Sequence, residues 1–328
     1  MKRNPSKVGA FLLASALACS WSPAWAQSVN GVADGAAFLL IPIGGRASAL
    51  GQAAIADGGD SEAAFWNPAG LARLTVGEVA AHHAKTFISD NTALAAYFKV
   101  GGSSTMGLSA YLVDYGAQDA TVGDGLVTGR FSPRNIQLLA SYATDLGGGV
   151  AFGVNYKLIQ LRQDCSGDCG AFPSTVGTTH GVDVGVQYSP ISLPISFGAA
   201  LRHAGFRLQL QDLDQADPLP TRLDVGVVYV IALPELDPDA EPLDARILLD
   251  LQNRLNDPGI PEMRLGAEVG YGDLLRLRTG YAFISGESAG PSVGLGVKLG
   301  KLAVDFARLF YVSSNFDSPY FVSIRAGL

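Results

Sequence analysis

Charge is scarce in this chain. Only 16% of its 328 residues are charged and 48% are hydrophobic, whereas a soluble domain usually carries about 25% charge. The formal net charge is −7 and no cluster of Lys and Arg occurs beyond the first seven residues, which argues against nucleic acid as a partner. Long apolar runs are also lacking after residue 26, so no transmembrane helix is expected. The 40 glycines have no three-residue period, which excludes a collagen-like chain.

The first 26 residues have the pattern of a secretory signal peptide. Lys2, Arg3 and Lys7 precede an apolar run over 8–18, and Ala24-Trp25-Ala26 offers a small-x-small cleavage site. Cleavage just before Cys19, as in a lipoprotein, is the alternative. We therefore expect an exported protein whose mature chain begins at Gln27.

From residue 76 onward, apolar and polar residues alternate with a period of two. Phe152, Val154 and Tyr156, for example, alternate with Asn155 and Lys157, the pattern of a strand with two different faces. Most segments are about 10 residues long, as tilted membrane strands are. The fourteen predicted strands are 77–87, 92–100, 104–114, 134–145, 149–162, 178–189, 195–204, 221–231, 244–256, 262–272, 274–285, 290–300, 302–312 and 319–328.

The connections between these segments alternate between short and long. The links 101–103, 145–148 and 300–301 are short, whereas 115–133 and 163–177 are long. Tight periplasmic turns and longer outer loops are typical of bacterial outer-membrane barrels. A secreted sandwich is the alternative fold. We predict an all-β transmembrane fold: a 14-stranded antiparallel outer-membrane barrel over 76–328, in which strand 319–328 pairs with strand 77–87 because lipid tolerates no open sheet edge.

Charged residues of the predicted strands share one face. A charge on the lipid side near mid-bilayer costs about 2–4 kcal/mol, so this face is expected to line the lumen. There the charges pair with one another and lock a plug, or they line a substrate path. The lumen charges singled out are Lys157, Asp183, Arg246, Asp250, Arg264, Glu268, Arg276, Arg278, Lys298 and Asp305.

Residues 27–75 do not alternate and are too apolar to hang free in the periplasm. Fourteen strands leave a lumen too wide for wall side chains alone to fill, so this segment is expected to form a small hatch inside it. The expected hatch contacts are Asn67 and Arg46, with Arg46 pairing with Asp250 or Asp305.

Two blocks of this segment, Arg-Ala-Ser-Ala-Leu-Gly and Trp-Asn-Pro-Ala-Gly-Leu, resemble the N-terminal signature of the PorV/PorQ family, relatives of the FadL-type transporters. The resemblance implies a non-enzymatic outer-membrane barrel that binds exported cargo proteins in type IX secretion and surface attachment. The alternative is a FadL-like channel for long-chain fatty acids or other hydrophobic small molecules. The motif residues are Arg46, Gly51, Trp66, Asn67, Pro68 and Gly70.

Few residues invite chemistry. His82 and His83 are adjacent and so face opposite sides of a strand, and His180 and His203 are expected at the loop rim. No Ser/His/acid set has a recognisable spacing, so neither an enzyme nor a cofactor is expected. Cys165 and Cys169 are expected to form a disulfide in an oxidising compartment, with metal binding as the alternative. No acidic cluster fits the calcium-loop spacing. Four loop aromatics remain as candidates to line a pocket or a cargo groove: Phe131, Phe172, Phe206 and Phe316.

Overall fold

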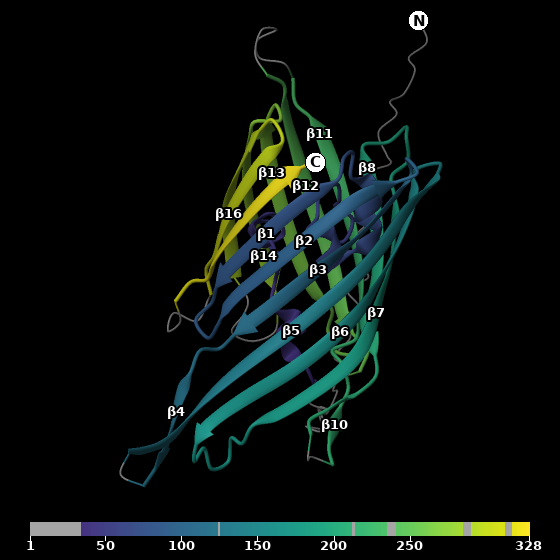
Figure 1. The fold of residues 1–328 in the computed structure, drawn as a ribbon. Helices are drawn as coiled ribbons and strands as arrows, with labels where there is room; N and C mark the ends of the chain where they lie inside the picture. Colours follow the sequence, from purple (N-terminus) through teal and green to yellow (C-terminus); the bar gives the residue numbers. More distant parts are fainter. Residues whose placement is uncertain are drawn as a thin grey trace, which may run out of the picture. The chain divides into compact units, whose positions relative to one another are not determined.

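A closed ring of antiparallel strands dominates the structure (Figure 1). The computed structural model describes residues 34–123, 125–211, 214–234, 241–256, 258–284, 290–311 and 317–328, and in these ranges fourteen strands form the ring. They are β1 (Glu78–Lys85), β2 (Asp90–Val100), β3 (Ser104–Asp114), β5 (Leu126–Gly147), β6 (Val150–Gly167), β7 (Thr175–Tyr188), β8 (Ile195–Gly205), β11 (Arg222–Ala232), β12 (Leu243–Arg254), β13 (Glu262–Tyr271), β14 (Leu275–Phe283), β15 (Gly290–Leu299), β16 (Leu302–Leu309) and β17 (Tyr320–Gly327).

The first and last strands close the ring, as predicted. Glu78 of β1 lies opposite Gly327 of β17, and the pairing continues to Lys85 opposite Tyr320. β3 pairs with β5 over its full length, from Ser104 to Asp114. Every ring strand therefore has two neighbours, which satisfies the backbone hydrogen-bonding groups that lipid would leave unpaired.

The two faces of the wall are inverted relative to a soluble protein. Along β7 the exposed positions include Val182, Val184 and Val186, whereas the buried positions that alternate with them include Asp183 and Gln187. The apolar face meets the surroundings and the polar face points inward, because lipid solvates apolar side chains and excludes charge. The predicted 14-stranded transmembrane barrel is confirmed.

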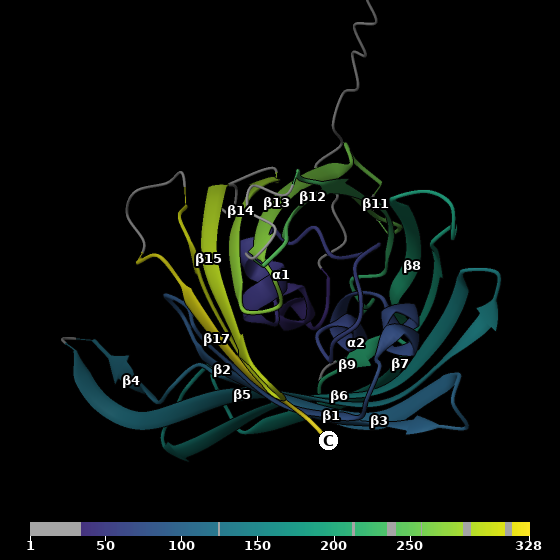
Figure 2. The same cartoon turned by 90° about the horizontal axis from the view of Figure 1, so that it is seen from above.

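The hatch lies inside the ring (Figure 2). It contains two 3-10 helices, η1 (Ala37–Leu40) and η2 (Pro68–Arg73), and two short α-helices, α1 (Gly45–Ala49) and α2 (Ala63–Trp66). No helix in the described ranges is long and apolar enough to cross a membrane.

Glycines of the wall let the hatch backbone approach closely. A Cβ at Gly280 would lie 2.0 Å from the amide nitrogen of Gly51, and a Cβ at Gly153 would lie 2.3 Å from the carbonyl carbon of Pro68. Real Cβ atoms do not reach such distances. The small residues of the inner face are thus explained by packing of the hatch against the wall.

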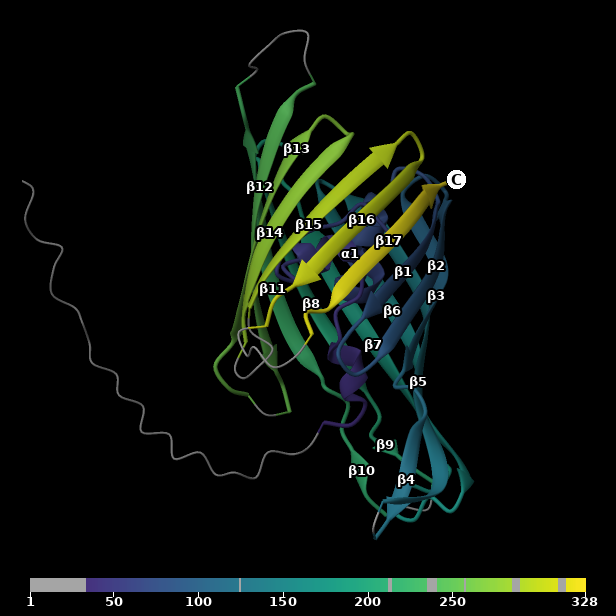
Figure 3. The same ribbon diagram turned by 90° about the vertical axis from the view of Figure 1, so that its left-hand side faces the viewer.

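The strands on one side are longer than predicted. β5 begins at Leu126 and β6 runs to Gly167, so the predicted loops 115–133 and 163–177 are partly sheet. A further strand, β4 (Gln118–Val122), pairs with β5 beyond the ring. We call β4 with residues 126–133 and 163–167 the outer arm, which extends past the rest of the barrel (Figure 3). Two short strands, β9 (Leu208–Gln209) and β10 (Ala216–Asp217), pair in the connection between β8 and β11.

Candidate functional site

The lumen has two mouths, which we call the turn end and the loop end. Short connections such as 101–103 and 300–301 lie at the turn end, and 86–89 and 206–221 lie at the loop end. The hatch lies between the mouths. The chemistry of each mouth, and of the hatch that separates them, defines what the barrel can do.

The hatch carries an ion cluster of its own. Arg46 in α1 pairs with Asp57 at 2.6 Å and with Asp60 at 2.7 Å. The predicted pairing of Arg46 with Asp250 or Asp305 is therefore wrong. The chain folds back between α1 and α2, which brings the two hatch carboxylates nearer to Arg46 than any wall carboxylate.

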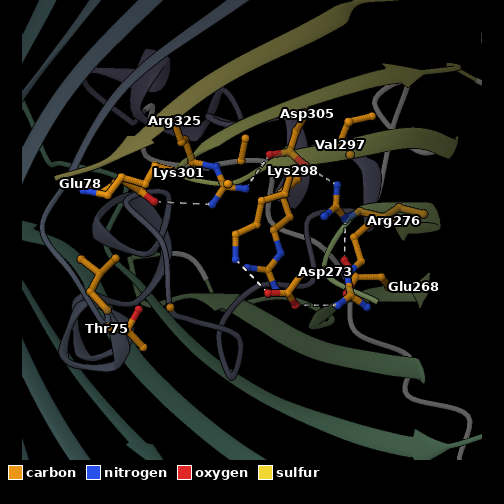
Figure 4. Close-up of a pocket in the computed structure, with 18 of the residues that line it drawn as sticks. Thr75, Glu78, Glu268, Asp273, Arg276, Val297, Lys298, Lys301, Asp305 and Arg325 are labelled. Atoms are coloured by element: carbon orange, nitrogen blue, oxygen red, sulfur yellow. Dashed lines mark hydrogen bonds and ion pairs between the residues drawn. The ribbon is translucent and has the colours of Figure 1, made fainter. Parts of the chain in front are cut away.

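Wall residues extend this cluster across the lumen. Arg325 of β17 pairs with Asp60 at 2.9 Å and with Asp305 of β16 at 2.6 Å, and Arg278 of β14 pairs with Asp305 at 2.5 Å and with Glu268 at 2.6 Å. Figure 4 shows Arg325 and Asp305 pointing toward each other. Burial alone would raise the pKa of Asp60, but the charges of Arg325 and Arg46 outweigh it and hold that pKa well below its usual value.

A second junction fixes α1 to the wall through Glu62. Its carboxylate accepts hydrogen bonds from the amides of Arg46 (3.2 Å) and Ala47 (2.9 Å) and from the hydroxyl of Ser323 (3.0 Å). Burial is the main cause that raises the pKa of Glu62 to about 7, and the charge of Asp60 adds to it.

Ser323 also lies 2.8 Å from Nδ1 of His82. The sequence pattern did not predict that Glu62, His82 and Ser323 meet, because they come from the hatch, β1 and β17. The serine stands between the acid and the imidazole, whereas a hydrolytic triad needs the imidazole in the middle. Ser323 is fully buried, so the arrangement is a hatch anchor rather than a nucleophile.

The turn end opens into a charged vestibule of about 630 Å³ (Figure 4). Basic and acidic side chains alternate around it: Arg276 pairs with Asp244 at 2.5 Å, and Lys298 pairs with Asp273 at 3.1 Å. Arg246 reaches the hatch, where it pairs with Asp57 at 3.2 Å. Charged side chains carry most of the contacts across the vestibule, and apolar residues such as Leu74, Val230 and Val297 lie between them.

The loop end holds a smaller pocket of about 290 Å³. Its floor is the apolar hatch segment Leu40-Ile41-Pro42, and its sides include Ile284, Leu309, Tyr311 and Phe321. The charged residues of the lining are Arg222, Arg254, Glu262 and Arg264. We call this cavity the outer pocket.

The hatch also bonds directly to the barrel wall below the outer pocket. Asn67 donates to the carbonyl oxygens of Ile55 (2.7 Å) and Val186 (3.2 Å). Asp250 accepts from the amides of Ala54 (2.7 Å) and Ile55 (3.0 Å). Asn67 thus lies where a hatch contact was expected, and the wall carboxylate Asp250 binds hatch backbone instead of Arg46.

The remaining lumen charges all lie on the inner face. Lys157 and Asp183 form a fully buried pair at 2.8 Å, and Arg264 pairs with Glu262 at 2.8 Å. The other hatch motif residues, Gly51, Trp66, Pro68 and Gly70, are buried in the hatch.

The predicted position of His203 at the loop rim is wrong. It is 2% exposed inside the lumen, not at the rim, and its Nδ1 lies 2.9 Å from Nζ of Lys157. A β-bulge places both Arg202 and His203 opposite Asp183, with φ of 57° at His203. Period-two patterns cannot reveal such an inserted residue.

His180 lies on the outer wall, where its Nδ1 is hydrogen-bonded to the hydroxyl of Tyr156. Cys165 of the outer arm forms a disulfide with Cys169, which lies just after the arm in sequence. Phe131 of the outer arm stacks on Phe172, with ring centroids 4.6 Å apart. Phe206 is exposed in a loop, and Phe316 lies outside the described residues, as do 27–33 and the predicted signal peptide.

A family model described as an uncharacterised protein family, UPF0164, matches residues 14–201, more than half of the chain. The chain belongs to the UPF0164 family. No curated protein matches this UPF0164 member in sequence.

Three solved structures share the fold of this UPF0164 barrel. The CymD monoaromatic hydrocarbon channel is 13% identical, with 88% of this chain and 98% of that chain covered and a TM-score of 0.59. The Pseudomonas putida toluene transporter TodX is 11% identical, with coverage of 85% and 95% and a TM-score of 0.54. A Pseudomonas aeruginosa FadL homologue is 12% identical, with coverage of 88% and 99% and a TM-score of 0.52.

Proposed function

We propose that this protein is an outer-membrane channel that takes up compact hydrophobic molecules through the outer pocket. The observation that carries the proposal is the apolar floor Leu40-Ile41-Pro42, which the hatch presents to the loop end of a barrel. A pocket with mostly apolar walls and a few convergent polar groups is the usual form of a small-molecule site. The solved barrels named above as hydrocarbon and toluene channels support the same class of ligand.

The lining also limits what enters. The volume of about 290 Å³ suits a monoaromatic hydrocarbon or a short acyl chain rather than a folded protein. Arg222, Arg254 and Arg264 at one side would favour a ligand with a polar or acidic end. A long-chain fatty acid is therefore compatible only if its tail reaches beyond the pocket.

Passage to the turn end requires a change in the hatch. The outer pocket and the charged vestibule are separate cavities, and the hatch residues Ala53, Ile55 and Asn67 are fully buried and line neither of them. The β3–β5 ladder is continuous, so these two strands leave no gap for a sideways exit. In this proposal the ligand binds above the hatch, and the ion cluster around Asp60 must loosen before it leaves.

Uptake of radiolabelled toluene by cells that produce the protein tests the proposal. Ile41→Asp places a carboxylate on the pocket floor and is expected to reduce uptake several-fold. Ile191→Asp, at a 92% exposed turn position, makes the same exchange away from the pocket and should leave uptake unchanged. Equal uptake by Ile41→Asp and the parent protein would contradict the proposal.

A second candidate function is the binding of exported polypeptides, as the PorV/PorQ resemblance implies. The outer arm favours it, because β4 is the last strand of the sheet order and its outer edge has no strand beside it in the described ranges. Such an edge can accept an extended peptide, and Val122, Leu126 and Val127 near it are 51–69% exposed.

Uptake and surface-protein attachment should be measured in the same deletion strain. Loss of uptake with normal attachment supports the channel, and the reverse supports cargo binding. Val122→Pro would weaken only the second function, since proline removes an amide donor from the edge strand.

A further inference from the structure

A small space adjoins the outer pocket, with which it shares lining residues that include Leu40, Arg222 and Arg264. Its volume is about 20 Å³, enough for one water-sized occupant. The hatch contributes Gln52 and Trp66 to its lining, and the wall contributes Lys157, Arg202, Arg222 and Arg264. No Asp or Glu in the described part of the chain lines it. We call it the cationic void.

Two polar side chains that line the void, His203 and Gln252, each have an N–H donor without a partner. Their other hydrogen bonds show which nitrogen carries that donor. Lys157 has only hydrogens to offer, so Nδ1 of His203 accepts from it at 2.9 Å. The imidazole proton must then be on Nε2, which is buried without a partner. Oε1 of Gln252 accepts from Arg202 (3.4 Å) and Arg222 (3.3 Å), which leaves its Nε2 as a buried, unpartnered donor.

Two guanidinium groups add further unused donors. Nε of Arg222 and Nε of Arg264 are also buried without a partner, although the terminal nitrogens of both arginines pair with Glu262 at 3.5 and 2.8 Å. All four residues are less than 8% exposed. A buried donor without an acceptor costs about 1–3 kcal/mol, so four around one void call for an occupant that accepts hydrogen bonds.

The nearby carboxylates are already engaged by other groups. Asp183 binds Lys157, Asn155 and the amide of His203, and Asp224 pairs with Arg202 at 2.5 Å. One Asp224 oxygen has no partner, but Asp224 does not line the void. The charged side chains of the lining are therefore all cationic, and apolar hatch residues such as Leu39, Ile43 and Phe65 form the rest of it together with neutral polar groups.

We propose that the cationic void binds a halide ion. A water molecule must place two hydrogens of its own. The side-chain oxygens of the lining are those of Gln52, Gln137 and Gln252, and those of Gln52 and Gln252 already accept from arginines. A monovalent anion accepts from several donors at once and is attracted by the surrounding Lys and Arg. A single-atom halide needs less room than tetrahedral sulfate or phosphate, and the space is small. Since the void joins Gln52 and Trp66 of the hatch to β8, β11, β12 and β13, the bound halide stabilises the closed hatch.

Trp66 makes the proposal testable, because it lines the void and is the only tryptophan after residue 26. The protein is produced from Gln27 behind a standard leader and purified in detergent, and Trp66 fluorescence is titrated with bromide, a heavy-atom quencher. Ionic strength is held constant with gluconate. We expect saturable quenching that chloride reverses by competition and sulfate does not.

Gln252→Glu replaces an unused donor by a carboxylate and should raise the bromide concentration for half-quenching about tenfold or more. Gln118→Glu makes the same exchange in the outer arm and should leave it unchanged. Quenching that is linear in bromide, or unaffected by chloride, would overturn the proposal.

The heat-dependent gel mobility of the barrel shows whether Gln252→Glu folds. If it does not, chloride competition in the parent protein decides. An anomalous bromide peak in the void of soaked crystals is an independent test. Water alone in the void refutes the proposal.

Discussion

The two mouths of the lumen differ in what they offer a ligand. The turn end is a charged vestibule of about 630 Å³, whereas the loop end is a smaller pocket of about 290 Å³ with an apolar floor. The hatch separates them, and Arg246 and Arg325, which pair with the hatch carboxylates Asp57 and Asp60, line the vestibule. In the proposed function, the loop end captures the ligand and the ion pairs near the turn end hold the hatch closed.

The largest effect is expected from breaking the lock at the turn end. Arg325→Met leaves the buried carboxylates Asp60 and Asp305 without one of their cations. Removing one partner of a buried ion pair destabilises a protein by about 3–5 kcal/mol. The hatch should open, seen as a rise in single-channel conductance, while ligand binding in the outer pocket persists.

Lys301→Met is the matched control, because Lys301 lines the same vestibule but is exposed at its rim. An unchanged conductance in Arg325→Met, with normal folding, would show that this ion cluster does not hold the hatch.

A steric clash between the wall and the hatch tests the attachment of the hatch without changing any charge. A Cβ at Gly280 would meet the backbone of Gly51 at 2.0 Å, and overpacking of this kind costs about 1–3 kcal/mol. Gly280→Ala should lower the thermal midpoint and increase protease cleavage within 34–75. Gly259→Ala, with open space around its Cβ, should do neither. Identical cleavage in the two variants would mean that the hatch tolerates displacement.

The attachment of the hatch to the wall is also expected to depend on pH. Burial raises the pKa of Glu62 to about 7, so the folded hatch holds this proton more tightly than the unfolded chain. The stabilisation that protonated Glu62 contributes is complete below about pH 4.5 and is lost as pH rises through 7. Over that range the free energy of unfolding falls by up to about 1.4 kcal/mol per pH unit.

Protease sensitivity of the hatch should therefore increase between pH 5 and pH 8. Glu62→Gln should flatten that profile, whereas Glu241→Gln, an exposed turn-end position, should preserve it. A profile that falls with pH in the parent protein would reverse the assignment.

The smallest effect is expected in the outer arm. The Cys165–Cys169 disulfide closes a loop of only four residues in sequence separation, and short loops give little chain-entropy stabilisation. Cys165→Ser with Cys169→Ser should leave the thermal midpoint of the barrel unchanged and increase proteolysis only in the arm. A large drop in the midpoint would show that the arm supports the ring.

Much of the wall could be predicted from period-two patterns. Strand 104–114 has the bounds of β3, and the inward residues Asp183 and Asp305 lie where the pattern places them. The outer arm was missed because its strands follow loops rich in Gly and Asp. The bulge at His203 was missed because an inserted residue leaves the alternation on either side intact.

Two features of the architecture follow from the order of residues alone. Alternation along the strands fixes which face meets lipid, and the long strands must close into a ring because lipid offers no partner to an open sheet edge. The partners inside the lumen depend instead on how the chain folds back on itself. Arg46 reaches Asp60 and not Asp250, and Glu62 meets Ser323 from the far end of the chain. A strand pattern depends on neighbours two residues apart, whereas an ion pair depends on which of several equal charges the folded backbone brings within about 4 Å.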